Sequence, residues 1–269
     1  MELIRRTRAV WAKRSVLGTL VTRDLRVRYA QSWLGYLWTV LDPLLMTMVY
    51  FFVFVIVLDR GDIGHQPYIL FLIVGLLSWQ WFSGSLTDTS RALTKEARLV
   101  RSINLPREIW VVRVVASKGA EFLLSLPVLI AFTIFYAAQG EAHVNGWLVL
   151  FPVAVVFQAV ALVGIGLMLA SVTVLVTDMQ RVIRIALRIL FYSTPVIYAA
   201  RLVPEPYDYL TWFNPMTGIL EAMRAGFFEH DQYPIVWGSM VVAVVMSVIL
   251  LFLGVFVFRR LERPALKEI

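Results

Sequence analysis

Long apolar stretches alternate with short basic segments along most of this chain. Each stretch carries one formal charge or none, and each is long enough to cross a hydrocarbon core, which takes about 20 helical residues. The stretches cover residues 32–58, 67–87, 119–140, 151–176 and 234–258. This pattern predicts an all-α membrane protein in which each stretch is a transmembrane helix.

A further span, residues 184–200, is predicted from topology rather than from length. After Arg181, Arg184 and Arg188, only residues 189–200 are free of charge, which is short for a crossing. The basic segment 181–188 and the basic tail after residue 258 lie on the same side only if the chain crosses between them. We therefore expect six transmembrane helices, with the N- and C-termini on one side.

The basic residues identify that side as the cytoplasm. Of the 25 Lys and Arg residues, all but Arg60, Arg201 and Arg224 fall in segments that share one side of the predicted topology. Basic loops of this kind are typical of the cytoplasmic face. No short apolar region with a small-residue cleavage site follows the basic N-terminus, so we expect this segment to be retained and to stay inside.

The composition is that of a membrane protein, and it indicates which kinds of molecule the basic residues contact. The chain is 59% hydrophobic and 16% charged, whereas a soluble domain is about 25% charged. The net charge of +7 comes from basic residues beside apolar spans, where anionic lipid headgroups attract them. We therefore expect contact with membrane lipids and not with nucleic acid. The chain has no cysteine, which excludes disulfides and thiolate metal sites.

Two regions flank or interrupt the spans. Residues 1–31 are expected to form a cytoplasmic N-terminal segment, and residues 32–269 the membrane domain. Between the fifth and sixth spans, residues 201–231 contain three prolines and several aromatic residues. Proline prevents one long helix, and aromatic side chains suit the headgroup region. We expect short re-entrant helices here, dipping part of the way into the membrane.

Residues 16–29 show the pattern of an amphipathic helix. Leu17, Val21 and Leu25 recur at i+4, while Arg23 and Arg26 lie around the other side. Such a helix lies along the inner membrane surface. The pattern fits a passive anchor and a lever that transmits force from a cytoplasmic partner equally well.

The loop at residues 91–104 is predicted to be helical and two-faced. Its apolar stripe consists of Leu93, Ala97 and Val100. Opposite the stripe, at helical spacing, are basic residues: Arg91, Lys95, Arg98 and Arg101. A solvated loop on the cytoplasmic side would also be rich in basic residues, because cytoplasmic loops of membrane proteins carry an excess of Lys and Arg. A docking element for another protein would show it too, and periodicity does not separate the two.

No catalytic motif is present. The chain lacks the GxxxxGK[ST] phosphate loop, so it does not bind and hydrolyse ATP by that route. The three histidines fall in or beside outer loops without metal-ligand spacing. Asp42 is an acid inside a span, which is often functional, but its position before Pro43 fits a helix start equally well. The residues predict a protein that is not an enzyme and holds no cofactor or metal.

Four segments resemble a known family. They are RDLRVRYAQSWLGYLWTVLDPLLMTMVYFFVF (23–54), LPREIWVVRVV (105–115), TPVIY (194–198) and FNPMTGILEAMR (213–224). Together they resemble the transmembrane subunit of ABC-2 type exporters, and within these the branch that exports lipid-linked polysaccharides such as O-antigen, teichoic acid and actinobacterial galactan. The resemblance covers nearly the whole chain and includes the order of the motifs.

The resemblance implies partners and roles. Subunits of this family pair with a second copy of themselves and bind two copies of a separate ATPase, which holds ATP and Mg²⁺. The loop 91–104 then corresponds to a coupling helix that docks on the ATPase, and residues 16–29 to an interface helix. The coupling helix would comprise Arg91, Lys95, Ala97, Arg98, Arg101 and Asn104. The interface helix would include Leu17, Val21, Arg23, Leu25 and Arg26.

The resemblance also implies a pathway along the two-fold axis, lined by the first and fifth spans of both copies. Aromatic rings there could stack on sugar rings without requiring one sugar sequence. The candidates are Tyr50, Phe54, Tyr192, Tyr198 and Trp212. The expected function is export of a lipid-linked polysaccharide, with a cell-wall galactan favoured weakly by the excess of Arg over Lys. The alternatives are an exporter of a drug or small lipid, a membrane glycosyltransferase, and a scaffold that transports nothing.

Overall fold

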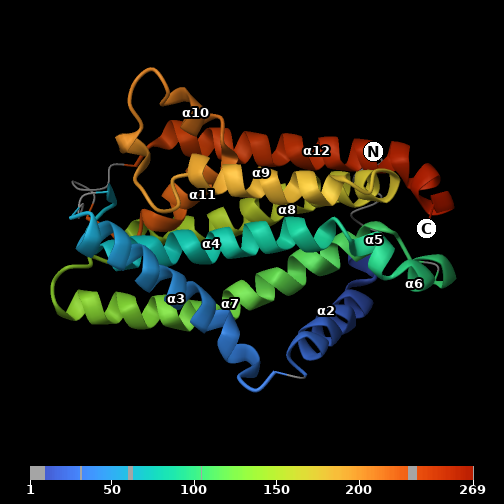
Figure 1. Cartoon of the computed structure of the whole chain (residues 1–269), viewed down its shortest axis with the longest axis horizontal. Helices are drawn as coiled ribbons and strands as arrows, with labels where there is room; N and C mark the ends of the chain where they lie inside the picture. The colour runs from blue at the N-terminus through green and yellow to red at the C-terminus, as the bar shows by residue number, and fades with distance from the viewer. Residues whose placement is uncertain (1–9, 31, 60–62, 104, 230–234, 269) are drawn as a thin grey trace.

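A computed structural model describes residues 10–30, 32–59, 63–103, 105–229 and 235–268 (Figure 1). Within these residues the regular structure is helical, and no strand is present. The arrangement is a bundle of long helices, with shorter helices at both of its ends. The all-α fold predicted from the apolar pattern is confirmed.

Five helical segments of the described chain are long and apolar enough to cross a membrane. The first, Gly35–Val57, combines a 3-10 turn at Gly35–Leu37 (η1), the α-helix α3 (Trp38–Phe51) and a π-helical end at Phe52–Val57 (η2). The others are α4 (Tyr68–Thr89), α7 (Glu108–Ala138), the segment Gly146–Leu175 made of η4 (Gly146–Val149) and α8 (Leu150–Leu175), and α12 (Trp237–Glu268). They overlap five of the six predicted spans, although α7 begins 11 residues before the predicted start at residue 119 and α12 continues ten residues past the predicted end at residue 258.

The remaining predicted span is shorter as a helix than expected. Helix α9 covers Met179–Ser193, whereas the predicted span runs from residue 184 to residue 200. The helix ends because Pro195 follows Thr194, and a residue before proline favours extended backbone; Thr194 has ψ 139°. The 15 residues of α9 extend over about 22 Å. The buried, non-helical residues 194–197 continue the chain, and the count of six spans stays a prediction.

Helix α4 forms the centre of the bundle. Most of its residues are buried, and it packs against α3, α7, α8 and α9. A buried polar contact joins it to α8: Ser78 Oγ donates to Gln158 Oε1 (2.9 Å), and Gln158 Nε2 donates to the Ser78 carbonyl (2.9 Å). In a membrane such paired amide and hydroxyl groups hold neighbouring helices together.

Helices α8 and α12 approach each other more closely than side chains would allow. A Cβ atom on Gly164 would collide with the Leu250 carbonyl, and one on Gly254 would collide with the Gly164 carbonyl. Small residues at a helix contact let the two backbones meet, which is a common way for membrane helices to associate. Around Gly164 and Gly254 the backbones of the two helices are therefore in direct contact.

The segment between α9 and α12 forms short helices, as its prolines predict. These are η5 (Ala200–Leu202), α10 (Tyr209–Trp212) and α11 (Pro215–Arg224). Helix α11 begins with Pro215 at its first turn, and Asn214 caps it by accepting a hydrogen bond from the Met216 backbone N–H (3.0 Å). Nearly all of α11 is buried, and it packs against α4, α8 and α12.

At the opposite end of the bundle lie α2 (Arg14–Tyr29), α5 (Ala92–Lys95) and α6 (Ala97–Ser102), together with the end of α12 (Figure 1). Helix α2 packs against α7, and α5 packs against α7 and α8. The two segments expected to face a cytoplasmic partner are therefore neighbours, although more than 60 residues separate them in the sequence.

Candidate functional site

The loop between α4 and α7 presents a basic surface. Arg91, Lys95, Arg98 and Arg101 are exposed. On the other side Leu93 and Val100 are buried in a cluster with Trp110 and Val111 of α7, and Ala97 is half-buried. Asn104 lies outside the described residues. The two faces read from the periodicity are both present in the folded chain.

The expectation of one continuous helix over residues 91–104 is wrong. The chain forms α5 and α6 with a break at Glu96, where φ is −113° and ψ is 27°. The Glu96 carboxylate bonds with Arg23 of α2 (2.6 Å) and Arg113 of α7 (3.4 Å). These two cations hold the side chain between three elements, and this accounts for a change of direction that hydrophobic periodicity does not encode.

Helix α2 is attached to the bundle by two groups of ion pairs. The first group contains Arg23, Asp24, Glu96 and Arg113, in which Arg113 Nε lies 3.0 Å from Asp24 Oδ2. The Arg113 side chain is 4% exposed, so its charge needs both carboxylates as partners. This group joins α2, α6 and α7. On the apolar side of α2, Leu17, Val21 and Leu25 are half-buried, and Arg26 is exposed.

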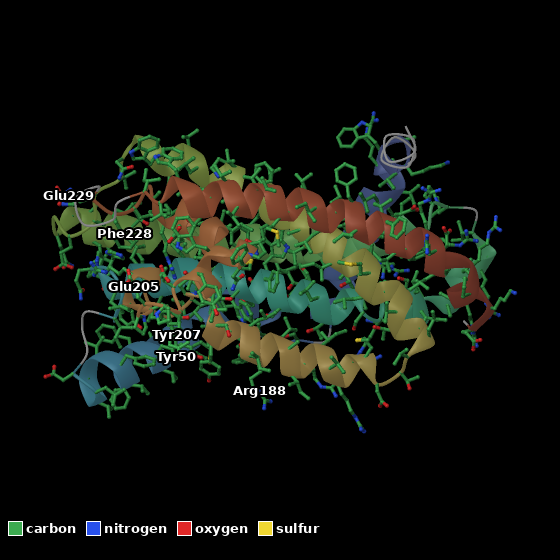
Figure 2. The ribbon with its side chains drawn as sticks, turned by 90° about the horizontal axis from the view of Figure 1, so that it is seen from above. Tyr50, Arg188, Glu205, Tyr207, Phe228 and Glu229 are labelled. Carbon is green, nitrogen blue, oxygen red and sulfur yellow. The ribbon has the colours of Figure 1, made fainter. Side chains whose placement is uncertain are left out.

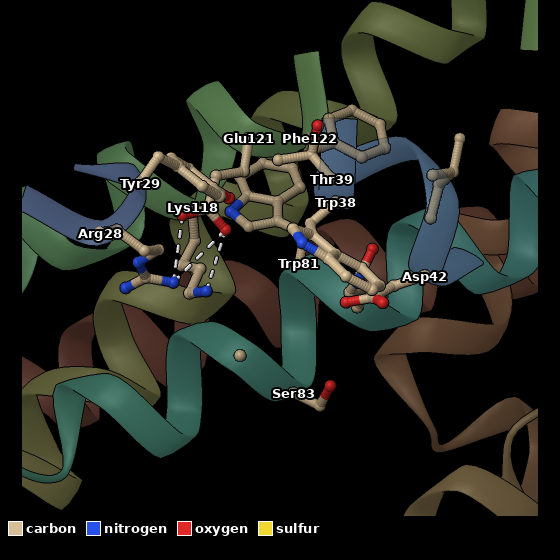
Figure 3. Close-up of a pocket in the computed structure, with 13 residues that line it drawn as sticks. Arg28, Tyr29, Trp38, Thr39, Asp42, Trp81, Ser83, Lys118, Glu121 and Phe122 are labelled. Atoms are coloured by element: carbon tan, nitrogen blue, oxygen red, sulfur yellow. Dashed lines mark hydrogen bonds and ion pairs between the residues drawn. The ribbon is translucent and has the colours of Figure 1, made fainter. Parts of the chain in front are cut away.

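The second group lies at the C-terminal end of α2 (Figure 3). Arg28 contacts Asp88 of α4 (2.8 Å) and Glu121 of α7 (3.0 Å), and Lys118 contacts Glu121 (2.9 Å). Burial of Arg28 acts to lower its pKa. The combined attraction of the negative charges on Glu121 and Asp88 is larger than this effect, so the pKa of Arg28 is raised above its usual value. Burial and the charge of Glu121 raise the pKa of neighbouring Tyr29 to about 12. Arg28, Tyr29, Lys118 and Glu121 border a cavity of about 330 Å³.

A second cavity, of about 380 Å³, lies between α3, α4 and α9. Its polar lining comes from Asp42 of α3, Gln80 and Ser83 of α4 and Arg188 of α9. Its aromatic lining comes from Tyr50, Trp79, Phe191 and Tyr192. Figure 2 shows Tyr50 and Arg188 along the same side of the molecule. We refer to this space as the α3–α9 cavity.

Four of the five predicted pathway residues gather near this cavity. The Tyr50 and Phe54 rings are stacked with centroids 6.3 Å apart, and Tyr50 lies 5.9 Å from the ring of Phe191. Tyr198 donates a hydrogen bond to the backbone carbonyl of Tyr192 (3.0 Å). Trp212 instead packs on Gly238 of α12, where a methyl group would lie 2.7 Å from its ring.

The end of the bundle opposite α5 and α6 is organised by Arg224, the last residue of α11. Its guanidinium donates to the carbonyls of Pro195 (2.7 Å), Val196 (2.7 Å) and Phe71 (3.2 Å), and lies 3.5 Å from the centre of the Phe71 ring. Arg224 is 1% exposed. It therefore provides donors for the carbonyls of Pro195 and Val196, which lie in the non-helical segment after α9, and ties this segment to Phe71 of α4.

The neighbours of Arg224 are arranged to fit it. Gly75 of α4 faces the guanidinium and the Val196 carbonyl, and a Cβ atom there would collide with both. Tyr68 donates to the carbonyl of Ile197 (2.7 Å), and Asn214 donates to the Thr194 hydroxyl (2.7 Å). The non-helical segment after α9 is thus held by α4 and α11 together.

Sequence reasoning missed Glu96, Arg113 and Arg224 as organising residues. For Arg224 a signal was present, because it is one of three basic residues outside the segments predicted to be cytoplasmic. For Glu96 and Arg113 the sequence gives no comparable sign, since their partners lie on other helices.

Comparison with known proteins gives a consistent set of relatives. The family described as ABC-2 type transporter matches residues 15–228. An O-antigen export system permease protein of Myxococcus xanthus is 33% identical over 258 residues, covering 95% of this chain and 96% of the relative. A protein of the same name from Klebsiella pneumoniae is 29% identical, covering 92% of each chain. A polysialic acid transport protein of Escherichia coli is 24% identical, covering 92% and 93%.

Proposed function

This chain belongs to the ABC-2 type transporter family, and from this premise we propose that it is the membrane subunit of an ATP-driven exporter that moves a lipid-linked polysaccharide outward across the bacterial cytoplasmic membrane. The observation that carries the proposal is the near full-length similarity to permeases named for O-antigen and polysialic acid. The aromatic lining of the α3–α9 cavity supports it, because rings offer flat apolar surfaces to sugars.

We also propose the assembly. Two copies of this chain pair and bind two copies of a separate ATPase subunit, which holds ATP and Mg²⁺. The exposed basic face of α5 and α6 docks on that subunit, and the Glu96 ion pairs carry its movement to α2 and α7. The lack of a phosphate loop in this chain supports a separate ATPase.

The polysaccharide we favour is a cell-wall galactan. The chain has 21 Arg and 4 Lys residues, a bias that goes with a GC-rich source such as an actinobacterium. The names of the relatives support a polysaccharide as the substrate class, and the galactan goes beyond them.

The proposed function is tested by depleting the chain in its own host. Lipid-linked polysaccharide should then accumulate in the cytoplasm while its amount at the surface falls. Unchanged export would overturn the proposal and favour an exporter of a drug or small lipid. Loss of synthesis without accumulation would point instead to a glycosyltransferase or a scaffold.

The orientation is tested by placing single cysteines in this cysteine-free chain. A cysteine at Glu205 should react in intact cells with a thiol reagent that does not cross membranes. One at Arg101, in α6, should react only after the cells are opened. Labelling of position 101 from outside would contradict the cytoplasmic placement of the basic loop.

A further inference from the structure

The C-terminal end of α12 extends past the predicted membrane span and packs onto the loop between α4 and α7. The predicted span ends at Phe258, and α12 continues to Glu268. Phe258 and Ala265 are each 1% exposed. Phe258 belongs to the cluster that buries the apolar side of α5 and α6, and Leu266 packs against the same cluster. The end of α12 is therefore attached to this loop.

An ion pair holds the same contact. Glu262 of α12 lies 2.9 Å from Arg107, the residue before α7, and the Glu262 side chain is 16% exposed. The residues of α12 that face the loop recur at i, i+4, i+7 and i+8 from Phe258, which places them on one side of the helix. The loop is thus supported by α12 on one side, as it is by the Glu96 ion pairs to α2 and α7.

The other side of the end of α12 is basic. Its exposed basic residues are Arg259, Arg260, Arg263 and Lys267. They lie at the end of the bundle that also presents the basic face of α5 and α6 (Figure 1). Two basic faces therefore flank one apolar cluster, at the end of the molecule that is predicted to be cytoplasmic.

Distance from the membrane separates these basic residues into two kinds. With the hydrocarbon core ending at Phe258, as the apolar pattern predicts, Arg260 lies about 3 Å beyond it, Arg263 about 8 Å and Lys267 about 14 Å. The headgroup layer is about 5–7 Å thick on each side. The Arg260 guanidinium lies over the Phe256 ring, 4.7 Å from its centre. Lipid headgroups therefore account for Arg260, whereas Lys267 lies beyond them.

The size of a protein interface connects the two basic faces. Packed helices lie about 8–10 Å apart, and the end of α12 shares one cluster with α5 and α6. A stable interface covers about 800 Å² of each partner, which is a patch about 30 Å across. A protein that docks on α5 and α6 would thus reach the end of α12. Its contact surface should be acidic, because both elements present basic side chains.

We propose that Arg263 and Lys267 of α12 form one docking surface with the basic face of α5 and α6, and that this surface binds an acidic face of the separate ATPase subunit. The inference rests on the proposed function, since it extends the contact with that same partner. The Arg107–Glu262 ion pair and Leu266 keep the end of α12 in position against α5 and α6.

The test places the photo-crosslinking amino acid p-benzoylphenylalanine at single positions of the full chain in its own host. After illumination, mass spectrometry identifies the crosslinked protein. Positions 98 and 267 should give the same product, a protein that carries the GxxxxGK[ST] phosphate loop. Position 260 should not give this product, because lipid headgroups surround it.

Charge reversal then measures the contribution of α12 to binding. Lys267→Glu should raise the Kd between the purified chain in lipid nanodiscs and the crosslinked ATPase about fivefold, as expected for replacing an attractive contact with a repulsive one. The difference should shrink at high salt. The matched control is Arg260→Glu, the same change of charge on the same helix, and it should leave Kd unchanged. Equal effects of the two variants would overturn the proposal and assign both residues to general electrostatic attraction.

Failure of this inference is distinguishable from failure of the proposed function. If position 98 crosslinks to the ATPase and position 267 does not, the end of α12 lies outside the docking surface, while the assembly of chain and ATPase stands. If neither position gives a protein with a phosphate loop, the docking surface is wrong as a whole. The depletion experiment reports export independently of both results.

Discussion

Replacement of Arg224 with methionine tests the role of α11 in closing the outer end of the bundle. The change keeps a long side chain but removes the donors to the carbonyls of Pro195, Val196 and Phe71. Each buried acceptor left without a partner costs about 1–3 kcal/mol. Because three carbonyls lose their donor, we expect the free energy of unfolding to fall by about 3–5 kcal/mol.

The assay is unfolding of the purified chain by increasing mole fractions of SDS in mixed micelles, followed by circular dichroism. Arg201→Met is the matched control, because Arg201 is exposed and, within the part of the chain that the structure describes, donates one long hydrogen bond, of 3.5 Å, to the Gly64 carbonyl. Its loss should cost less than about 1 kcal/mol. Equal stability of the Arg224 variant and the wild type would refute the reasoning that these three hydrogen bonds hold the segment after α9.

Three further outcomes are expected. Arg98→Glu combined with Arg101→Glu should abolish copurification of the ATPase and leave membrane insertion unchanged, and normal export by this variant would argue for a solvated loop. Gly254→Leu should lower the free energy of unfolding by about 1–3 kcal/mol in the same SDS assay, because its side chain would meet the backbone of α8. Tyr50→Ala with Phe54→Ala should slow export severalfold, since each lost stacking contact is worth about 1 kcal/mol; an unchanged rate in well-folded protein would place both rings outside the pathway.

The sequence predicted the features that depend on length and charge. An uncharged stretch of membrane length forms a helix wherever it lies, because backbone groups in lipid have no other partners. This is why α4, α8 and α12 match the predicted spans. The aromatic residues near the α3–α9 cavity were also accessible, because Tyr50 and Phe54 lie one turn apart on the same segment.

Features that depend on contacts between residues far apart in the sequence could not be predicted from the sequence. The break between α5 and α6 depends on the ion pairs of Glu96 with Arg23 and Arg113. The path of the chain after α9 depends on Arg224, which follows its carbonyl partners Pro195 and Val196 in the sequence by 29 and 28 residues. Periodicity within one segment reports which face is apolar, and it does not report which charges will meet. The residues of α4 that complete the lining of the α3–α9 cavity, which are Trp79, Gln80 and Ser83, were missed for the same reason.

The backbone contact between α8 and α12 has a mechanical consequence. Where Gly164 and Gly254 meet, backbone atoms of the two helices are in direct contact, so no side chain lies at this point that could change rotamer to let one helix slide past the other. The pair is therefore a stiff part of the chain. Helices α3 and α9 also pack against the core helix α4, but the α3–α9 cavity lies between the three helices, and part of their contact is made by aromatic rings such as those of Trp79 and Phe191. Any deformation that moves this protein through a working cycle should fall on α3 and α9, while α8 and α12 keep their relative position.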